Sequence, residues 1–374
     1  MELNYYVLGK KNNPMLLGYL DKYYDILCNK LRDISQKDIL TDDIWKLLDI
    51  ENRKFILNAD ISSTINIIHD IQILLKRPIW VFLPEIYQER LQKEIQFFLN
   101  KEEEHLITHQ WTTIGETNIR LTMADYNPFW AMWAHPDHAT SGAGLGWGEK
   151  TEKEWLQVYN KTFEVLKIID EDIYDELNQI ITKIIPFGTS YSLHNSCSHK
   201  DSIGHLYLGY TVDVEYPEFN NVEAVIHESS HNKLNLILQS EKLILNDMSE
   251  KYYSPYRPDA RHIHGIYIWL HAFAPVIYIL MGWYLRGLMW ESDIWLQKIL
   301  LYYVKNKISY KVLRKHGKFT PLWEKILEEM KYVMDITDTL SEKITNKSEV
   351  LQRVITYEKQ HFSEVNLKYP YLEY

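Results

Sequence analysis

The chain has 374 residues, of which 46% are hydrophobic and 25% are charged, as is typical of a soluble globular protein with a substantial core. Acidic residues outnumber basic ones by 51 to 41, and because phosphate groups need a basic surface, this balance excludes nucleic acid as the main partner. The two cysteines, Cys28 and Cys197, exclude a disulfide framework. The N-terminus also lacks the basic segment and apolar run of a secretory signal. The low cysteine count and this N-terminus together predict a cytoplasmic enzyme.

The first half of the chain is expected to be mostly helical. Apolar positions recur near helical spacing in residues 14–33, 62–76 and 84–99. A strand is expected within residues 117–126, and another helical segment over 151–183. Residues 135–151 hold four of the 14 glycines and are expected to form a loop over a cleft.

The second half combines two expected strands with longer helices. The strands lie in residues 185–196 and 203–216, and further helices are expected over residues 288–306, 320–338 and 340–361. Between them, a helix is predicted to begin at Asn220 as N-cap, with Glu223 completing a capping-box-like pair. Residues 262–285 lack Asp, Glu, Lys and Arg but include three histidines, which favours a buried core helix over a membrane span.

The motif His227-Glu228-x-x-His231, within VIHESSHNKLNLIL, is the strongest chemical signal in the chain. Histidines four residues apart on a helix lie on one face, one turn apart, so both imidazoles can reach one metal ion. Two structural histidines on a buried helix are the alternative. The capped helix, the strand before it and the histidine-rich helix after it favour a metal site.

These patterns predict an α+β fold that is mostly helical, with a zincin-like metal-binding helix pair beside a small sheet. Two regions are expected along the chain. Residues 1–183 form a mainly helical N-terminal region that includes the glycine-rich loop. Residues 184–374 form a metal-binding catalytic region with the small sheet and the remaining helices.

A catalytic metal needs a third protein ligand, and the histidines of the next helix are the nearest candidates. His264 is our choice because it lies where that helix should begin, with His271 second. Along a helix these two are about 10 Å apart, so both cannot readily serve one ion. We assign His262 to capping or packing, while Asp259 and Glu223 remain carboxylate alternatives.

Two chemistries fit the motif. With Zn²⁺, Glu228 is a general base toward metal-bound water, and the reaction is peptide hydrolysis. However, neither the N-E-x-x-S-D motif of one peptidase group nor the H-x-x-G-x-x-H continuation of another is present. With Fe²⁺, the remaining positions can take an oxo-acid and O₂. The carboxylate of 2-oxoglutarate then needs a cation, for which Arg257 and Arg261 are candidates, although pairing with Asp259 explains them equally well.

The segments HNSCS…IGHLYL, AVIHESSHNKLNLI and YYSPYRPDARHIHGIYIWLHAFAP together resemble the H-E-x-x-H-motif proteins found with peptide-modification gene clusters. The resemblance covers about residues 190–280. It implies an Fe(II)- and 2-oxoglutarate-dependent hydroxylase of side chains in ribosomally made peptides. By the same resemblance, His227 and His231 are iron ligands, and Arg257 or Arg261 contacts the cosubstrate. With His264 as third ligand, the site departs from the usual two-His-one-carboxylate set.

We therefore predict an Fe(II)/2-oxoglutarate-dependent dioxygenase that hydroxylates an amino-acid side chain. Its substrate is expected to be a peptide or an amino acid, with neither nucleic acid nor a membrane as partner. Glu228 then orients His231 or a metal-bound water. The alternatives are a zinc-dependent H-E-x-x-H peptidase and a non-catalytic helical protein that binds a metal or a partner.

Two other segments carry weaker signals. HPDH, residues 135–138, contains the H-x-D pair of cupin-type oxygenases, but that fold needs many short strands. Its two histidines can instead line a substrate cleft. Asn195, Ser196 and Ser198 precede an expected strand, where an extended peptide can pair with the sheet edge; an ordinary polar turn is the alternative.

Overall fold

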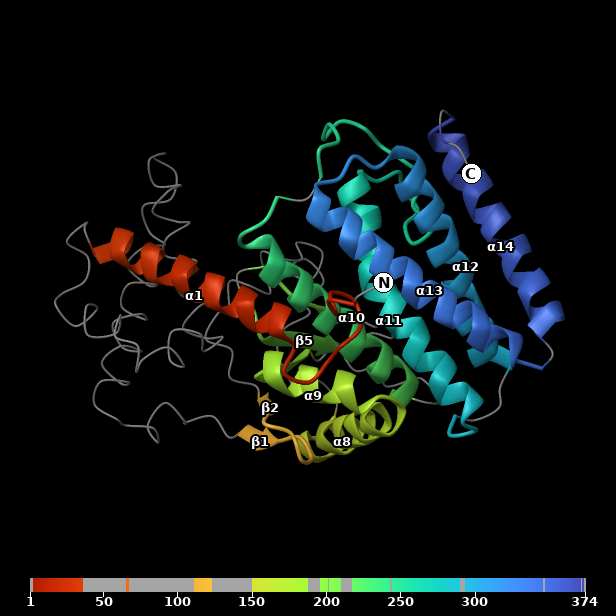
Figure 1. Cartoon of the computed structure of the whole chain (residues 1–374). Coiled ribbons are helices and arrows are strands. Elements are labelled where there is room, and N and C mark those ends of the chain that lie inside the picture. The colour runs from red at the N-terminus through yellow and green to blue at the C-terminus, as the bar shows by residue number, and fades with distance from the viewer. Residues whose placement is uncertain are drawn as a thin grey trace.

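The computed structural model describes a mostly helical protein with one small mixed sheet (Figure 1). The described residues are 3–35, 65–66, 111–122, 150–187, 196–200, 202–209, 217–242, 244–289, 293–345, 347–370 and 372. The helices named within them are α1 (Pro14–Ser35), α8 (Glu152–Ile169), α9 (Glu171–Ile180), α10 (Pro217–Leu238), α11 (Ile263–Leu285), α12 (Asp293–His316), α13 (Pro321–Glu342) and α14 (Lys347–Lys368). The strands are β1 (Trp111–Thr113), β2 (Arg120–Thr122), β3 (Lys183–Phe187), β4 (Ser196–Cys197) and β5 (His205–Gly209).

This architecture confirms the mostly helical α+β class, and the helices expected at 14–33 and in the second half are present as α1 and α11–α14. The helix expected at 84–99 lies outside the described residues, as do residues 135–149 of the glycine-rich loop. Of the helix expected at 62–76, only residues 65–66 are described, and both are helical.

The sheet has the strand order β1-β2-β3-β5-β4. β3 pairs in parallel with both β2 and β5, whereas β1 and β4 are antiparallel edge strands. Parallel neighbours need a long crossover, and α8 and α9 provide it between β2 and β3. The sheet thus draws strands from both sides of residue 183, and the two-region division stays a prediction.

The helical segment expected over 151–183 is two helices that meet at Asp170. Asp170 has an extended backbone, with φ −153°, which ends α8. Its side chain accepts a hydrogen bond from the Ile173 N–H at 3.0 Å and so caps α9. One residue therefore stops one helix and starts the next.

The predicted N-cap of the motif helix is wrong. α10 begins at Pro217, a residue that suits a first helical turn, so Asn220 lies inside the helix. Asn220 and Glu223 both bind Lys298 of α12, at 2.8 and 2.7 Å. The Tyr302 hydroxyl also donates to Glu223, at 2.7 Å. These polar residues join two helices instead of capping one.

The apolar helix α11 is the centre of the helical layer. By length and composition it could cross a membrane, but 72% of its most apolar window is buried within the protein. It packs against α10, α12 and α13, and its Tyr267 hydroxyl donates to the Trp323 carbonyl at 3.0 Å. This packing is that of a core helix, as expected from its histidines; the cytoplasmic location stays a prediction.

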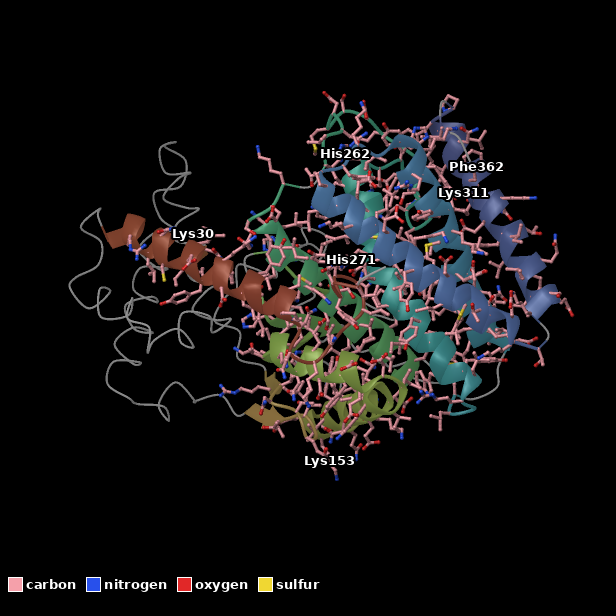
Figure 2. The ribbon with its side chains drawn as sticks, viewed as in Figure 1. Lys30, Lys153, His262, His271, Lys311 and Phe362 are labelled. Atoms are coloured by element: carbon pink, nitrogen blue, oxygen red, sulfur yellow. The ribbon has the colours of Figure 1, made fainter. Side chains whose placement is uncertain are left out.

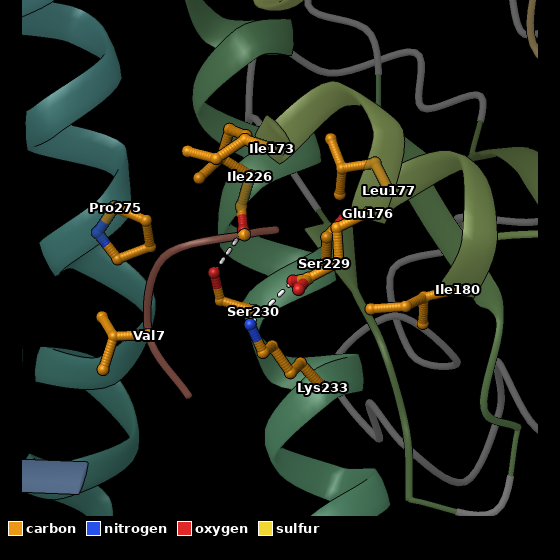
Figure 3. A pocket seen from close by; sticks show the side chains of 11 residues that line it. Val7, Ile173, Glu176, Leu177, Ile180, Ile226, Ser229, Ser230, Lys233 and Pro275 are labelled. Atoms are coloured by element: carbon orange, nitrogen blue, oxygen red, sulfur yellow. Dashed lines mark hydrogen bonds and ion pairs between the residues drawn. The ribbon is translucent and has the colours of Figure 1, made fainter. Parts of the chain in front are cut away.

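The N-terminal segment around Val7 lies between α10 and α11 (Figure 3). Lys233 of α10 and His271 of α11 each contact one of its backbone carbonyls. Lys233 of α10 pairs with Glu176 of α9 at 2.7 Å, and the two side chains are only 3% and 6% exposed. Lys233 also donates to the Leu8 carbonyl at 3.0 Å. Glu176 accepts from the Asn13 side chain and the Lys10 N–H at 2.9 and 3.0 Å, so one carboxylate joins three segments.

We expect Lys233→Met to lower the free energy of unfolding by about 3 kcal/mol, because it leaves Glu176 buried without its cation. Lys11→Met is the matched control, since Lys11 pairs with Asp175 of the same helix α9 but is 61% exposed; it should leave the free energy of unfolding almost unchanged. Urea unfolding with a chelator present measures both. The double variant with Lys233→Met and Glu176→Gln should be less destabilised than the single variant Lys233→Met. Equal losses of unfolding free energy in Lys233→Met and Lys11→Met would contradict the argument.

Candidate metal centre

His227 and His231 face each other one turn apart on α10. Their Nε2 atoms are 2.9 Å apart, and their ring centroids are 4.5 Å apart. Two ring nitrogens at about 2.1 Å from one ion, at a right angle, would stand about 3.0 Å apart. Burial lowers the pKa of His231 to about 4, so this imidazole is neutral at pH 7, the form that binds a metal. The 2.9 Å spacing is that of a hydrogen bond between the two rings, and it is also compatible with two ligands at a right angle around one ion; a metal at this pair stays a prediction.

Glu228 is directed toward the sheet. Its Oε1 accepts a hydrogen bond from the Ser196 hydroxyl at 2.7 Å, and Ser196 opens the edge strand β4. The carboxyl is 4% exposed, and this burial raises its pKa to about 7 against the lowering effect of Ser196. One turn later, Asn232 donates to the His205 carbonyl at 3.0 Å and accepts from the Gly204 N–H at 2.7 Å. These bonds fix the sheet-facing side of α10.

The opposite wall of the centre is aromatic. Trp269 of α11 has its centroid 5.2 Å from that of His227 and 6.5 Å from that of His231. Phe273, one turn further on, lies 4.7 Å from His227. Tyr256 stacks on both, with centroids 5.6 Å from Trp269 and 4.3 Å from Phe273. Our sequence analysis missed this wall; the i, i+4 spacing of Trp269 and Phe273 was its only local sign.

The structure does not bring His264 to the pair. Among the described residues, no three His, Cys, Asp or Glu side chains form a group that could hold a metal ion. The reason is where along α11 the two helices meet. Trp269 is the residue of α11 that contacts both histidines, and His264 lies about 7.5 Å before it along the helix axis. His262 accepts a hydrogen bond from the His264 N–H at 3.1 Å, which confirms the predicted capping role.

The other third-ligand candidates have different partners. His271 is fully buried in the middle of the molecule, where its Nε2 lies 3.1 Å from the Tyr6 carbonyl (Figure 2). Burial lowers the pKa of His271 to about 3, so it is a neutral group that holds the N-terminal segment. Glu223 binds Lys298 and Tyr302, and Asp259 pairs with arginines.

Both candidate arginines contact one carboxylate. Asp259 lies 2.9 Å from Arg261 Nε and 3.7 Å from Arg257 Nε, and the three side chains are about 40% exposed. The ion pair that the sequence offered as an alternative is therefore present. Two cations on one anion leave an excess positive charge at the surface, which suits a dicarboxylate; this role stays a proposal.

The loop that carries Arg257 and Arg261 is held in place by contacts with α12 and α14. The Tyr256 hydroxyl donates to Asn306 at 2.6 Å. The Tyr253 hydroxyl lies 2.8 Å from His361 Nδ1 and 3.3 Å from the fully buried Glu358. The loop that carries Arg257 is therefore held by α12 through Tyr256 and by α14 through Tyr253.

No protein-family model matches this chain, and a search of curated proteins finds no match either. The resemblance drawn from the motifs therefore stays a prediction, and function has to be argued from the site. The HPDH segment and Asn195 lie outside the described residues. Ser196 is described, and its contact with Glu228 places the edge strand at the motif.

We expect His227→Ala and His231→Ala each to weaken Co²⁺ or Zn²⁺ binding by more than about 100-fold. This loss exceeds the one typical of residues that only hydrogen-bond to a metal ligand. His264→Ala should stay within a few-fold of the unmodified protein, because His264 lies apart from the pair. Competition against a chelator gives the affinities, and circular dichroism checks that the variants fold. A loss in His264→Ala equal to that in His227→Ala would restore His264 as third ligand.

Proposed function

We propose that this protein is an Fe(II)- and 2-oxoglutarate-dependent oxygenase that hydroxylates a side chain of a peptide or amino acid. The observation that carries the proposal is the shared wall: Tyr256, next to Arg257, stacks on the two rings that contact His227. The metal pair and the candidate cosubstrate cations thus belong to one structural unit.

The aromatic wall also weighs against a peptidase of the type that takes a third ligand from the next helix. In that arrangement a glutamate projects from the second helix toward the histidines. Here the positions of α11 that contact His227 are Trp269 and Phe273, which offer no metal ligand. Apolar rings on that side would keep water from part of the surroundings of a bound ion.

Iron bound by the pair would couple the oxidation of 2-oxoglutarate to succinate and CO₂ with insertion of one oxygen atom of O₂ into a C–H bond. His227 and His231 would hold the ion through their ring nitrogens. Arg257 and Arg261 bind the distal carboxylate, sharing Asp259 as counter-ion. Glu228 and Ser196 fix the sheet-facing side of the site.

A zinc peptidase is the second candidate, and one contact favours it. The Glu228 carboxyl, with its pKa near 7, suits a general base. It lies beside β4, an antiparallel edge strand with which an extended peptide can pair. The peptidase hypothesis assigns a role to Glu228 but none to the aromatic wall or to Arg257 and Arg261.

Incubation with Fe(II), 2-oxoglutarate and O₂ should yield succinate, even without a substrate to hydroxylate, as measured by mass spectrometry. Arg257→Ala or Arg261→Ala should raise the KM for 2-oxoglutarate about tenfold or more, the effect of one lost charge-assisted bond. Arg314→Ala is the matched control, because Arg314 is 45% exposed and paired with Glu324. Peptide cleavage restored by zinc, with no succinate under iron, would overturn the proposal in favour of the peptidase.

Asp259→Asn separates a binding role of the arginines from a purely structural one. If Arg257 and Arg261 bind the cosubstrate, removing the competing carboxylate should lower the Kd for 2-oxoglutarate several-fold. If they only pair with Asp259, the same change should leave this Kd unchanged. Asp259 is 39% exposed, so its neutralisation should cost little stability. The visible charge-transfer band of an Fe(II)–2-oxoglutarate chelate, recorded without O₂, measures the Kd.

A further inference from the structure

The N-terminal segment is held through its backbone, and its described residues form no helix or strand before α1 begins at Pro14. Glu329 of α13 accepts hydrogen bonds from the Asn4 and Tyr6 N–H groups, each at 2.6 Å. His271 of α11 contacts the Tyr6 carbonyl, with its Nε2 3.1 Å from the oxygen. Tyr6 is therefore held at both its N–H and its carbonyl.

The next part of the segment meets α10 and α9 in the same way. Lys233 of α10 donates to the Leu8 carbonyl at 3.0 Å, and Glu176 of α9 accepts from the Lys10 N–H at 3.0 Å. The contacts thus fall on every second residue, at positions 4, 6, 8 and 10, and four helices each contribute one side chain. In peptide recognition, hydrogen bonds to the main chain supply affinity, while contacts with side chains supply specificity.

The four side chains that hold this backbone are buried, and we call them the backbone-binding site: Glu176, Lys233, His271 and Glu329, each 5% exposed or less. Burial raises the pKa of Glu329, and the Asn4 and Tyr6 N–H groups counteract this shift. Buried charged groups are costly unless they are hydrogen-bonded or paired. The site is therefore matched to a peptide backbone and would be left unsatisfied without one.

Two positions of the segment depend on its side chains. Gly9 lies against the backbone of α9, where an added Cβ would stand 2.7 Å from the Ile173 Cα. Val7 is 3% exposed and lies between α10 and α11 (Figure 3). Asn4 and Lys11, in contrast, are exposed, so the segment lies at the surface. The site therefore selects glycine at one position and a buried aliphatic residue at another.

We propose that the backbone-binding site is a peptide-binding site: residues 4–10 fill it in the intact chain, and the same segment binds there as a separate peptide. Its ligand needs N–H groups at positions 4, 6 and 10, which excludes proline there, and glycine at position 9. Through Lys233 and His271 the occupant contacts α10, which carries the histidine pair, and α11, which carries two rings of the aromatic wall. The inference depends neither on a metal nor on the proposed oxygenase function.

The test starts from the folded, intact protein. A recognition sequence for a site-specific protease is inserted between Lys11 and Asn12, two exposed residues, and is cut after folding. The cut segment should stay with the rest of the protein in gel filtration, and circular dichroism should not change. An excess of a fluorescent peptide of residues 2–11 should then replace it at one site per chain, as measured by anisotropy. Before cutting, this peptide should bind at least about tenfold more weakly, because the tethered segment competes at an effective concentration on the order of millimolar.

Variants of the peptide separate recognition of the backbone from unspecific binding. Gly9→Leu should bind about tenfold to a hundredfold more weakly, because its side chain meets the backbone of α9. Tyr6→Pro should bind about tenfold more weakly or worse, because it lacks the N–H that Glu329 accepts. Lys10→Ala is the matched control, since it keeps the N–H that Glu176 binds, and its affinity should stay within a few-fold.

Loss of the fold on cutting, failure of the peptide to exchange, or equal binding of the Gly9→Leu and unmodified peptides would overturn the inference. If the insertion prevents folding, the full chain with Gly9→Leu serves instead, since its own segment no longer fits. The unmodified peptide should raise the melting temperature of this variant by several degrees, whereas the Gly9→Leu peptide should not. No difference between the two peptides in that measurement would equally overturn the inference.

Discussion

The buried ion pair between Lys233 and Glu176 is the constraint on which the placement of α10, the helix of the histidine pair, depends. Lys233 follows His231 by two residues, roughly 200° around the helix, so it points to nearly the opposite side. Fixing Lys233 against α9 and the Leu8 carbonyl therefore sets the rotation of α10 about its axis. That rotation decides that the histidine pair meets α11 and that Glu228 meets the sheet.

Local pattern was enough to predict the parts of the site that lie within one helix. The four-residue spacing of His227 and His231 required only that the segment be helical, and α10 is. The uncharged run at 262–285 was recognisable as a core helix because its histidines are unsuited to lipid, and His262 does cap it. In each case the deciding contacts lie within about one helical turn.

The parts that could not be predicted depend on packing between distant segments. Glu223 has the spacing of a capping residue, but Lys298, 75 positions later, lies against it and gives it another role. The choice of His264 assumed that the start of α11 faces the histidines, whereas the two helices meet further along, at Trp269. Helix register and rotation are set by the whole core, and no motif encodes them locally.

The two sides of α10 suit different reactions: Glu228 lies on the sheet side, and the aromatic rings lie on the α11 side. Hydrolysis needs water at the ion and a base beside it, which Glu228 on the sheet side could serve. Oxygenation needs exchangeable positions at the ion for an oxo-acid and O₂, and a nearby cation for the oxo-acid. A buried carboxylate near a metal is useful in either reaction, as base or as an orienting group. The stacked rings against His227 supply neither a metal ligand nor a base, so the α11 side is where the two proposals differ most.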